Sequence, residues 1–412
     1  MKISDVKLSV IQDSRGQDTL EARMIGDGFD VKASVPSGKS KGEHEVVSID
    51  PALAVAKFGE LRSEIISQSF GNQRAFDDFL IQKDATEKKD ALGGNVMLAL
   101  SLSFARAQSV LGGGELYEYI RELVGTRGAD KFPRPIFNVI NGGAHVAVPQ
   151  EWKDDSGREL KLDFQEFQII PKTDDFGLGL SVGQRCYEKL KMFLVDTFGA
   201  SRVLVGDEAG FCAPFTNNEE ALGVLQEVIS TYQHPMHIGL DTAATQFYKN
   251  GAYILSGVSF SPQELERRYR ELIDAYGVVS IEDPFFEEDF DSFEALTSDV
   301  AKKDVLVITD DLTTTNPKWL AKAIKEKAGN TILIKPNQIG TLSETLDVVS
   351  LAHQNGWKTV VSHRSGETED DFIADLAVGV GAWGLKSGAP ATPWRMNKYE
   401  RVLTIWQQNL SQ

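Results

Sequence analysis

The chain has 412 residues, of which 42% are hydrophobic, and it carries a formal net charge of −17 at pH 7. This length exceeds one ordinary domain and predicts a large globular unit with a smaller partner. The acidic charge argues against nucleic acid or an anionic membrane surface as a partner. No apolar run is long enough for a membrane span, and two cysteines without a signal-peptide pattern predict a cytoplasmic location.

In the first third of the chain, the hydrophobic pattern changes once, from one typical of strands to one typical of helices. Residues 1–50 alternate polar and apolar positions in three runs separated by turns, which predicts antiparallel strands. Residues 51–124 carry apolar residues around most of a helical surface, which predicts helices. The pattern stops in the segment VGTRGADKFPRP. We therefore expect an N-terminal α+β capping domain over 1–127 and a second domain over 128–412.

The second domain repeats one pattern, an apolar run of strand length that stops on an acid, an amine or an imidazole. Successive terminal residues lie 23 to 41 positions apart, which leaves room for one strand, one helix and two short loops. Runs that are apolar throughout are typical of strands buried on both faces. The terminal residues are Asp241, Glu282, Asp310, Lys335, His363 and Lys386.

Helix signals occupy the intervals between these runs. The stretches 261–264 (SPQE) and 341–344 (TLSE) have capping-box spacing. Asn250-Gly251 predicts a hairpin turn inside the longest interval. We therefore predict an α/β fold, with a closed TIM-like (β/α)8 barrel between residues 134 and 390. Polar residues at the carboxyl ends of such strands converge on one mouth.

Three of the terminal residues, Asp241, Glu282 and Asp310, are carboxylates on consecutive strands. Their oxygens are the ligands that Mg²⁺ prefers, with water or substrate completing the shell. The alternative is that each acid caps the following helix. The adjacent Asp311 has no clear assignment and is a candidate for orienting a lysine. Three acids on consecutive strands favour the metal site.

The cationic terminal residues lie across the predicted mouth from these acids. Nearby cations and partial desolvation lower the pKa of a lysine, so Lys335 and Lys386 are candidates for a base. The alternative is a buried salt bridge with one of the acids. The stretch 363–367 (HRSGE) is expected to open a helix, where free amides, Arg364 and Ser365 would suit a phosphate.

These motifs together resemble the enolase family along almost the whole chain. The resemblance implies an enolase-type barrel and a Mg²⁺-dependent lyase that interconverts 2-phospho-D-glycerate and phosphoenolpyruvate in glycolysis, a phosphopyruvate hydratase. The stretches that carry it are DSRGQDTLEA, VPSGKSKG, NVINGGAH, FQEFQIIP, VGDEAGF, GLDTAA, SIEDPF, TDDLTTTNP, IKPNQIGT, VSHRSGETED and LKSGAP.

The resemblance implies a role for each matched residue. Lys335 would remove the proton alpha to the carboxylate, and Glu208 would protonate the departing hydroxyl with Glu166 beside it. Two Mg²⁺ per site are expected. The first is assigned to Asp241, Glu282 and Asp310 and the second to Ser40. Lys386 would stabilise the developing charge, His363 would approach the hydroxyl, and the residues implied in binding the small phosphorylated carboxylate are His145, Gln165, Glu282, Arg364, Ser365 and Lys386.

Taken singly, some of these residues have simpler interpretations. Glu208 also fits a helix-cap acid, Glu166 a salt-bridge partner, and His145, which follows two glycines, a surface histidine.

Several positions depart from the family pattern. Lys39 and Lys41 flank Ser40, Gln246 replaces an acid, and residues 146–164 form a long charged loop. Thr404 replaces an arginine that in relatives pairs with an acid of the other subunit equivalent to Glu21. A homodimer or higher homo-oligomer is still expected. The departures leave open a paralogue acting on a larger anion, such as a carboxyphosphonoenolpyruvate synthase-like enzyme, and a noncatalytic binding protein on the same scaffold.

Overall fold

A computed structural model describes residues 1–39, 42–125 and 132–410. The N-terminal part confirms the predicted order of antiparallel strands followed by helices. Its three strands pair in chain order, and Gly28, with φ of +85°, forms the turn between the second and the third. The elements are β1 (Ile3–Gln12), β2 (Asp18–Gly26), β3 (Phe29–Ser34), α1 (Pro51–Ser67), α2 (Gln73–Asp84), α3 (Gly94–Gly112) and α4 (Leu116–Val124).

The second part is a closed barrel, as the apolar runs predict. Within the described residues its eight strands follow the order β4-β5-β8-β12-β13-β14-β15-β16, and β16 pairs with β4 to close the ring. The strands are β4 (Arg134–Asn141), β5 (Glu166–Pro171), β8 (Met236–Asp241), β12 (Val278–Glu282), β13 (Leu306–Thr309), β14 (Thr331–Ile334), β15 (Lys358–Ser362) and β16 (Gly384–Lys386).

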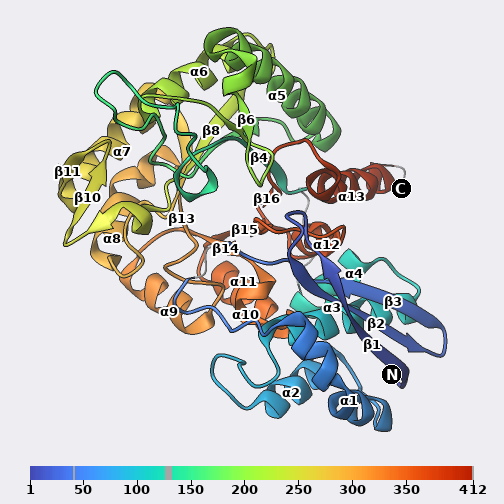
Figure 1. Ribbon diagram of the computed structural model, residues 1–412. Helices are drawn as coiled ribbons and strands as arrows, with labels where there is room; N and C mark the ends of the chain where they lie inside the picture. The colour runs from blue at the N-terminus through green and yellow to red at the C-terminus, as the bar shows by residue number, and fades with distance from the viewer. Residues whose placement is uncertain (40–41, 126–131, 411–412) are drawn as a thin grey trace.

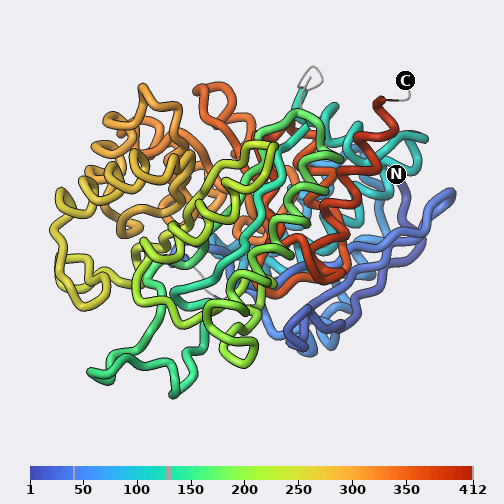
Figure 2. The backbone as a smooth tube through the Cα atoms, turned by 90° about the horizontal axis from the view of Figure 1, so that it is seen from above, coloured from blue at the N-terminus to red at the C-terminus, as the bar shows by residue number. Residues whose placement is uncertain are grey.

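One strand departs from the all-parallel barrel that the sequence pattern predicts. β5 runs antiparallel to both of its neighbours, β4 and β8. The segment between β4 and β5 contains the 3-10 turn Gly143–His145 and no crossover helix, so the chain returns beside β4 in the opposite direction. Glu166, the first residue of β5, therefore lies at the same mouth as the last residues of the other strands. Figure 2 shows the green segment around residues 146–164 projecting from the molecule.

Helices surround the barrel; the capping box predicted at 261–264 is complete, whereas at 341–344 only the bond from amide to hydroxyl is present. The Ser261 hydroxyl accepts from the Glu264 amide, and the Thr341 hydroxyl accepts from the Glu344 amide. Asn250-Gly251 turns between β9 (Tyr248–Lys249) and β10 (Ala252–Leu255), which pairs with β11 (Val258–Phe260). The helices are α5 (Phe176–Phe198), α6 (Asn218–Ser230), α7 (Pro262–Tyr276), α8 (Phe290–Val300), α9 (Pro317–Glu326), α10 (Pro336–Ile339), α11 (Leu342–Gln354), α12 (Phe372–Gly379) and α13 (Pro393–Leu410).

The helix predicted to open at residues 363–367 is wrong. Those residues form a loop after β15, and α12 begins only at Phe372. The Arg364 amide donates to the Glu367 carboxylate at 3.0 Å, and Gly366 forms a β-bridge with Ser37 of the N-terminal part. Side chains of this loop, rather than amides of a helix terminus, therefore face the mouth.

The N-terminal elements gather on one side of the barrel, where α2, α3 and α4 pack against α10, α11 and α12 (Figure 1). Arg106 of α3 forms ion pairs with Asp370 and Asp371 of the barrel. The predicted domain boundary at 127/128 lies outside the described residues. Within them no single helix is long and apolar enough to cross a membrane, although the bent pair α3 and α4 passes that test jointly.

Candidate active site

The cavity at the mouth of the barrel is formed by residues at the strand ends. Asp241, Glu282 and Lys386 are the last residues of β8, β12 and β16. Asp310, Lys335 and His363 each follow directly after a strand. The residues lining the cavity are Lys39, His145, Gln165, Glu166, Glu208, Asp241, Ala243, Gln246, Asp283, Asp310, Asp311, Lys335, Ser362, His363, Arg364, Ser365 and Lys386.

A buried lysine stands among three carboxylates at one side of the cavity. Lys386 Nζ lies 2.9 Å from Glu166 Oε2, 3.2 Å from Asp241 Oδ2 and 2.8 Å from Glu282 Oε2. Burial opposes the ammonium charge, but the three carboxylates prevail and raise the pKa of Lys386 well above its usual value. Lys386 therefore remains a cation, suited to stabilising negative charge rather than to accepting a proton.

The second lysine, Lys335, pairs with Asp310 through Nζ and Oδ2. Burial lowers the pKa of Lys335, but the charge of Asp310 outweighs it, so the pKa lies above its ordinary value. The prediction that the pKa of Lys335 is lowered is thus wrong for the protein without bound metal or substrate, because the Asp310 charge faces Lys335 directly. Gln338 Nε2 holds the other oxygen of Asp310 at 2.9 Å.

The three carboxylates predicted to bind a metal lie at or directly after the ends of neighbouring strands, and each faces a lysine. Asp241 and Glu282 share Lys386, whereas Asp310 faces Lys335. Among the described residues, the acid and histidine groups with ligand atoms within 4.8 Å of one another are His145, Glu166 and Glu208, and Asp283, Asp310 and Asp311.

Asp283 is a site residue that the sequence pattern did not single out. Its carboxylate accepts the amides of Asp310 and Asp311, both at 2.9 Å, and its own backbone has φ of +42°. Burial and the charges of Asp311 and Asp310 raise the pKa of Asp283 well above its usual range. Burial, followed by the charge of Asp310, raises the pKa of Asp311 to about 8. The only sequence signal for Asp283 was its position beside the strand-end Glu282.

The charge balance of the cavity fits a bound divalent cation. Carboxylates around the mouth outnumber the ammonium and guanidinium groups facing them in the described residues, and burial and Asp241 raise the pKa of Glu282 well above its usual range. Hard oxygen ligands in excess are the donor set that Mg²⁺ prefers. The carboxylates are Glu166, Glu208, Asp241, Glu282, Asp283, Asp310 and Asp311.

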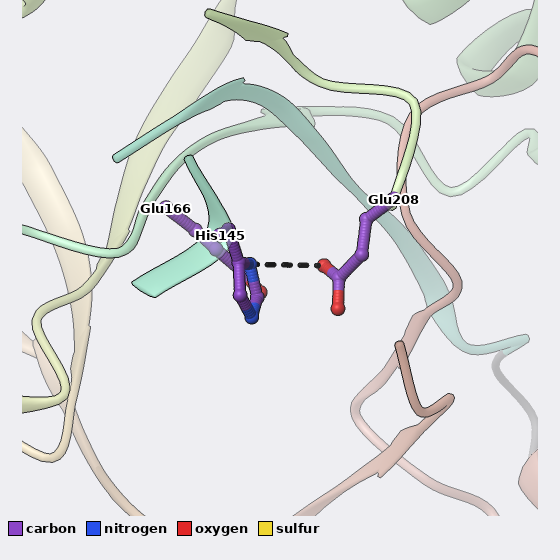
Figure 3. Close-up of side chains that lie close together, drawn as sticks. All are labelled: His145, Glu166 and Glu208. Carbon is purple, nitrogen blue, oxygen red and sulfur yellow. Dashed lines mark ion pairs between the residues drawn. The ribbon is translucent and has the colours of Figure 1, made fainter. Parts of the chain in front are cut away.

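A third group joins Glu166, Glu208 and His145 (Figure 3). His145 Nδ1 lies 4.0 Å from Glu166 Oε1 and 3.9 Å from Glu208 Oε2, and within the described residues this buried nitrogen has no hydrogen-bond partner. Burial and the charges of Glu208 and Asp241 raise the pKa of Glu166 well above its usual range, against Lys386. Burial also raises the pKa of Glu208, but the charges of the facing histidines and Arg395 outweigh burial and hold this pKa well below its usual range. The surroundings of the two acids thus favour the protonated form of Glu166 and the charged form of Glu208.

Residues of the N-terminal part complete the opposite wall. Both oxygens of Glu45 accept from the Arg364 guanidinium, at 3.0 and 3.1 Å. The Ser365 hydroxyl accepts the Lys39 amide at 2.9 Å. The Lys39 ammonium lies 3.3 Å from Asp207 Oδ2 in a partly exposed ion pair at the rim of the cavity. Ser40 and Lys41 lie outside the described residues. Glu45 was missed because it lies in an irregular segment without a strand-end pattern.

Gln165 and Gln246 form a bridge beneath His145. Gln165 Nε2 donates to Asp241 Oδ2 at 3.1 Å, and Gln246 Nε2 donates to Gln165 Oε1 at 2.5 Å. Gln246 Oε1 accepts the Ala144 amide at 3.0 Å, which fixes the turn that carries His145. The replacement of an acid by Gln246 therefore retains an acceptor for this turn and adds a donor for Gln165.

Comparison with known proteins matches the chain in two parts. Residues 3–120 match the family model described as the enolase N-terminal domain, and residues 129–412 match the enolase C-terminal TIM barrel domain. An enolase of Methanococcus maripaludis is 38% identical over 98% of this chain and 95% of its own length. An enolase of Methanocaldococcus jannaschii is 38% identical over 99% and 95%, and enolase B of Dictyostelium discoideum 37% identical over 99% and 95%.

Proposed function

The chain belongs to the enolase family, and on that premise we propose that it catalyses the reversible dehydration of 2-phospho-D-glycerate to phosphoenolpyruvate as a phosphopyruvate hydratase. The observation that carries the proposal is the placement of one lysine and one acid pair on different walls of a single cavity. Lys335 follows β14, whereas Glu208 and Glu166 lie near β7 and at the start of β5. β7 comprises Phe211–Cys212.

Removal of the proton alpha to a carboxylate adds charge to a group that is already negative. Lys335 is proposed as the base, because among the described residues its ammonium forms an ion pair with Asp310 alone, and a cation bound at Asp310 would lower the pKa of the lysine. Lys386 would receive the developing charge as a fixed cation. The two lysines thus have different roles because their carboxylate surroundings differ.

Two bound Mg²⁺ ions would supply electrostatic stabilisation of the doubly charged carboxylate formed on proton loss. Asp241, Glu282 and Asp310 are proposed to hold the first ion, and Ser40 to contribute to the second. In this protein Lys386 and Lys335 neutralise those acids, so the lysines must share them with the ion.

The proton for the departing hydroxyl is proposed to come from the acid pair. The raised pKa of Glu166 supports it as the holder of the proton, and Glu208, with His363 and His145 beside it, is proposed to deliver the proton to the hydroxyl. Arg364 and Ser365 are proposed to bind the phosphate, where the loop 363–367 meets the N-terminal segment. Gln165, His145 and Glu282 are proposed to complete the substrate contacts.

We also propose a cytoplasmic protein that assembles as a homodimer or higher homo-oligomer. Cys186 and Cys212 are buried free thiols whose pKa is raised by burial to about 12, a state compatible with a reducing compartment. Glu21, the acid that relatives pair with an arginine of the other subunit, forms a partly exposed ion pair with Lys32 of its own chain at 3.0 Å. Sedimentation velocity would measure the oligomeric state.

The test is the absorbance of phosphoenolpyruvate formed from 2-phosphoglycerate by the full chain. We expect turnover with Mg²⁺, its loss on chelation by EDTA and its return when Mg²⁺ is restored. Lys57→Ala, a substitution on the exposed side of α1, serves as the control and should retain full turnover. Negligible turnover by folded protein in saturating Mg²⁺ would overturn the proposal.

A further inference from the structure

A buried arginine lies behind the histidine of the active site. Arg395 of α13 is only 1% exposed. Its Nη1 donates to His363 Nδ1 and to the Arg364 carbonyl, the latter at 2.7 Å. Its Nη2 donates to the Asp207 carbonyl at 3.0 Å and to the Ser365 carbonyl at 2.7 Å. One guanidinium thus binds both the loop after β15 and the residue preceding Glu208.

The partners of Arg395 are unusual for a buried cation. Among the described residues no carboxylate forms an ion pair with it, so carbonyl dipoles and one imidazole nitrogen replace the usual counter-ion. A group buried in this way is costly unless its donors are satisfied, and four acceptors satisfy it here. Arg395 can therefore stay buried only while these loops hold the four acceptors in place.

The contact with His363 determines where the imidazole proton lies. A guanidinium only donates hydrogen bonds, so Nδ1 must be an acceptor and carry no proton. The proton of the neutral ring then sits on Nε2, which lies 3.5 Å from Glu208 Oε2. A second proton on Nδ1 would point directly at the guanidinium, which disfavours the imidazolium.

Neighbouring contacts hold Arg395 in place. A Cβ added to Gly388, which has φ of +77°, would lie 3.0 Å from Arg395 Cδ and 3.3 Å from His363 Cε1. The Ala389 amide donates to the Glu208 carbonyl at 2.9 Å. The segment after β16 therefore passes close to both the arginine and the acid, and only a glycine fits at its nearest point.

We infer that Arg395 is a positioning residue, which fixes His363 as a neutral ring with its Nε2–H directed at Glu208. On the proposed function, His363 is then a hydrogen-bond donor to the acid or to the departing hydroxyl, and the proton transferred comes from the pair Glu166 and Glu208 rather than from His363. Burial independently lowers the pKa of His363 well below its usual value; Glu208 raises it, whereas Arg395, Lys386 and Lys335 lower it.

The first test measures the ring nitrogens directly and does not depend on activity. Protein labelled with ¹⁵N-histidine is studied by long-range ¹H–¹⁵N correlation, with His363 assigned from the signals lost in His363→Gln. At neutral pH we expect an unprotonated Nδ1 and a protonated Nε2. A wild-type His363 that is an imidazolium or carries its proton on Nδ1 would overturn the inference, whatever the reaction catalysed.

The second test removes the donor. Arg395→Met should release Nδ1, so that His363 shows the other tautomer or the imidazolium, while kcat falls roughly 10- to 100-fold and KM changes far less. Arg395→Lys retains a donor and should restore the Nδ1 acceptor and part of kcat. Arg401→Met, which removes a cation of the same helix that pairs with Asp375, should leave the His363 signals unchanged. Unaltered His363 signals in a folded Arg395→Met would also overturn the inference; if that variant does not fold, the wild-type spectrum decides.

Discussion

The two active-site lysines differ in how many carboxylates hold them. Within the part of the chain that the structure describes, Lys386 forms ion pairs with three carboxylates, whereas Lys335 pairs with one, Asp310. When a single carboxylate stabilises the ammonium form of a lysine, binding of another cation to that carboxylate removes most of the stabilisation and lowers the pKa of the lysine. A lowered pKa allows the lysine to act as a base. These surroundings support the proposal that Lys335 is the base that abstracts the proton.

Lys335→Ala should abolish exchange of the alpha proton of 2-phosphoglycerate with deuterium from the solvent, because it removes the proposed base. Magnesium binding should largely persist. Proton NMR of the substrate in D₂O measures the exchange. Exchange at the wild-type rate would remove Lys335 from the mechanism.

Glu208→Gln provides the complementary variant. Loss of the acid should block departure of the hydroxyl, while exchange of the alpha proton continues, since enolisation precedes that step. If exchange stops as completely as in Lys335→Ala, Glu208 is required for the first step as well.

Glu282→Gln should weaken Mg²⁺ binding by about tenfold or more, equivalent to about 1.4 kcal/mol, because it removes one of the buried carboxylate charges facing the ion. Titration calorimetry measures the affinity. Glu400→Gln, which removes an exposed charge on α13, is the control and should bind Mg²⁺ as the wild type does. Unchanged binding by Glu282→Gln would make Glu282 a partner of Lys386 alone.

At the scale of elements, the strand-end rule predicted six residues that the structure places at the mouth of the barrel. It could do so because runs such as VVSIE and TILIK are mostly apolar and stop abruptly on a charge. The rule could not find Glu166, because Glu166 is the first residue of its strand and the apolar pattern does not reveal that β5 runs in the opposite direction. Only the family resemblance identified Glu166.

Arg395 was missed for a different physical reason. It lies in α13 among polar residues, where an arginine normally marks a solvated face. Its burial follows from the packing of the loops 206–210 and 363–367 against the helix, a tertiary contact that helical periodicity does not encode. Buried polar partners of this kind require the fold before they can be recognised.

Thr341→Ala should lower the free energy of unfolding by about 1 kcal/mol, because the buried hydroxyl caps α11 by accepting the Glu344 amide. Urea denaturation measures the loss. Thr341→Ser retains the hydroxyl and should retain most of the stability. An equal loss in both variants would attribute the effect to the lost methyl group instead of the cap.

At the scale of the molecule, a charge cluster fastens the N-terminal part to the barrel. Arg106 donates to both oxygens of Asp370, at 2.6 and 2.9 Å, and the Ser34 amide donates to the same carboxylate at 2.9 Å. Burial opposes the charge of Asp370, but Arg106 and the amides lower the pKa of this carboxyl below its ordinary value. The ion pair is largely shielded from water, so it resists screening better than surface pairs do.

Arg106→Met should lower the free energy of unfolding at pH 7 by about 3–5 kcal/mol, because it leaves Asp370 buried without its cation. A carboxyl with a lowered pKa in the folded state stabilises the protein above its unfolded pKa, near 3.8, and this contribution is lost as the pH falls through the folded value. In Arg106→Met, protonation of Asp370 at low pH instead removes an unpaired buried charge and so lessens the destabilisation. The difference between the two proteins should therefore shrink below pH 3.8, as urea denaturation at several pH values would show.

The matched control is Arg23→Met, because Arg23 forms an exposed ion pair with Asp30 on the N-terminal sheet. Its stability should stay close to that of the wild type. A difference between wild type and Arg106→Met that is independent of pH would mean that packing of the arginine stem, and not its charge, fastens the two parts.

The reversed strand β5 has a consequence for how this protein can diverge. The segment between β4 and β5 leaves the mouth beside His145 and returns to it at Gln165, while its tip, the turn at 154–157, lies far along the hairpin. Residues inserted at that tip lengthen the rim without shifting the pairing of any barrel strand. Insertions at this tip would change the rim of the mouth while the residues at the strand ends keep their places. The charged 146–164 loop of this chain lies at the position where added residues disturb the barrel least.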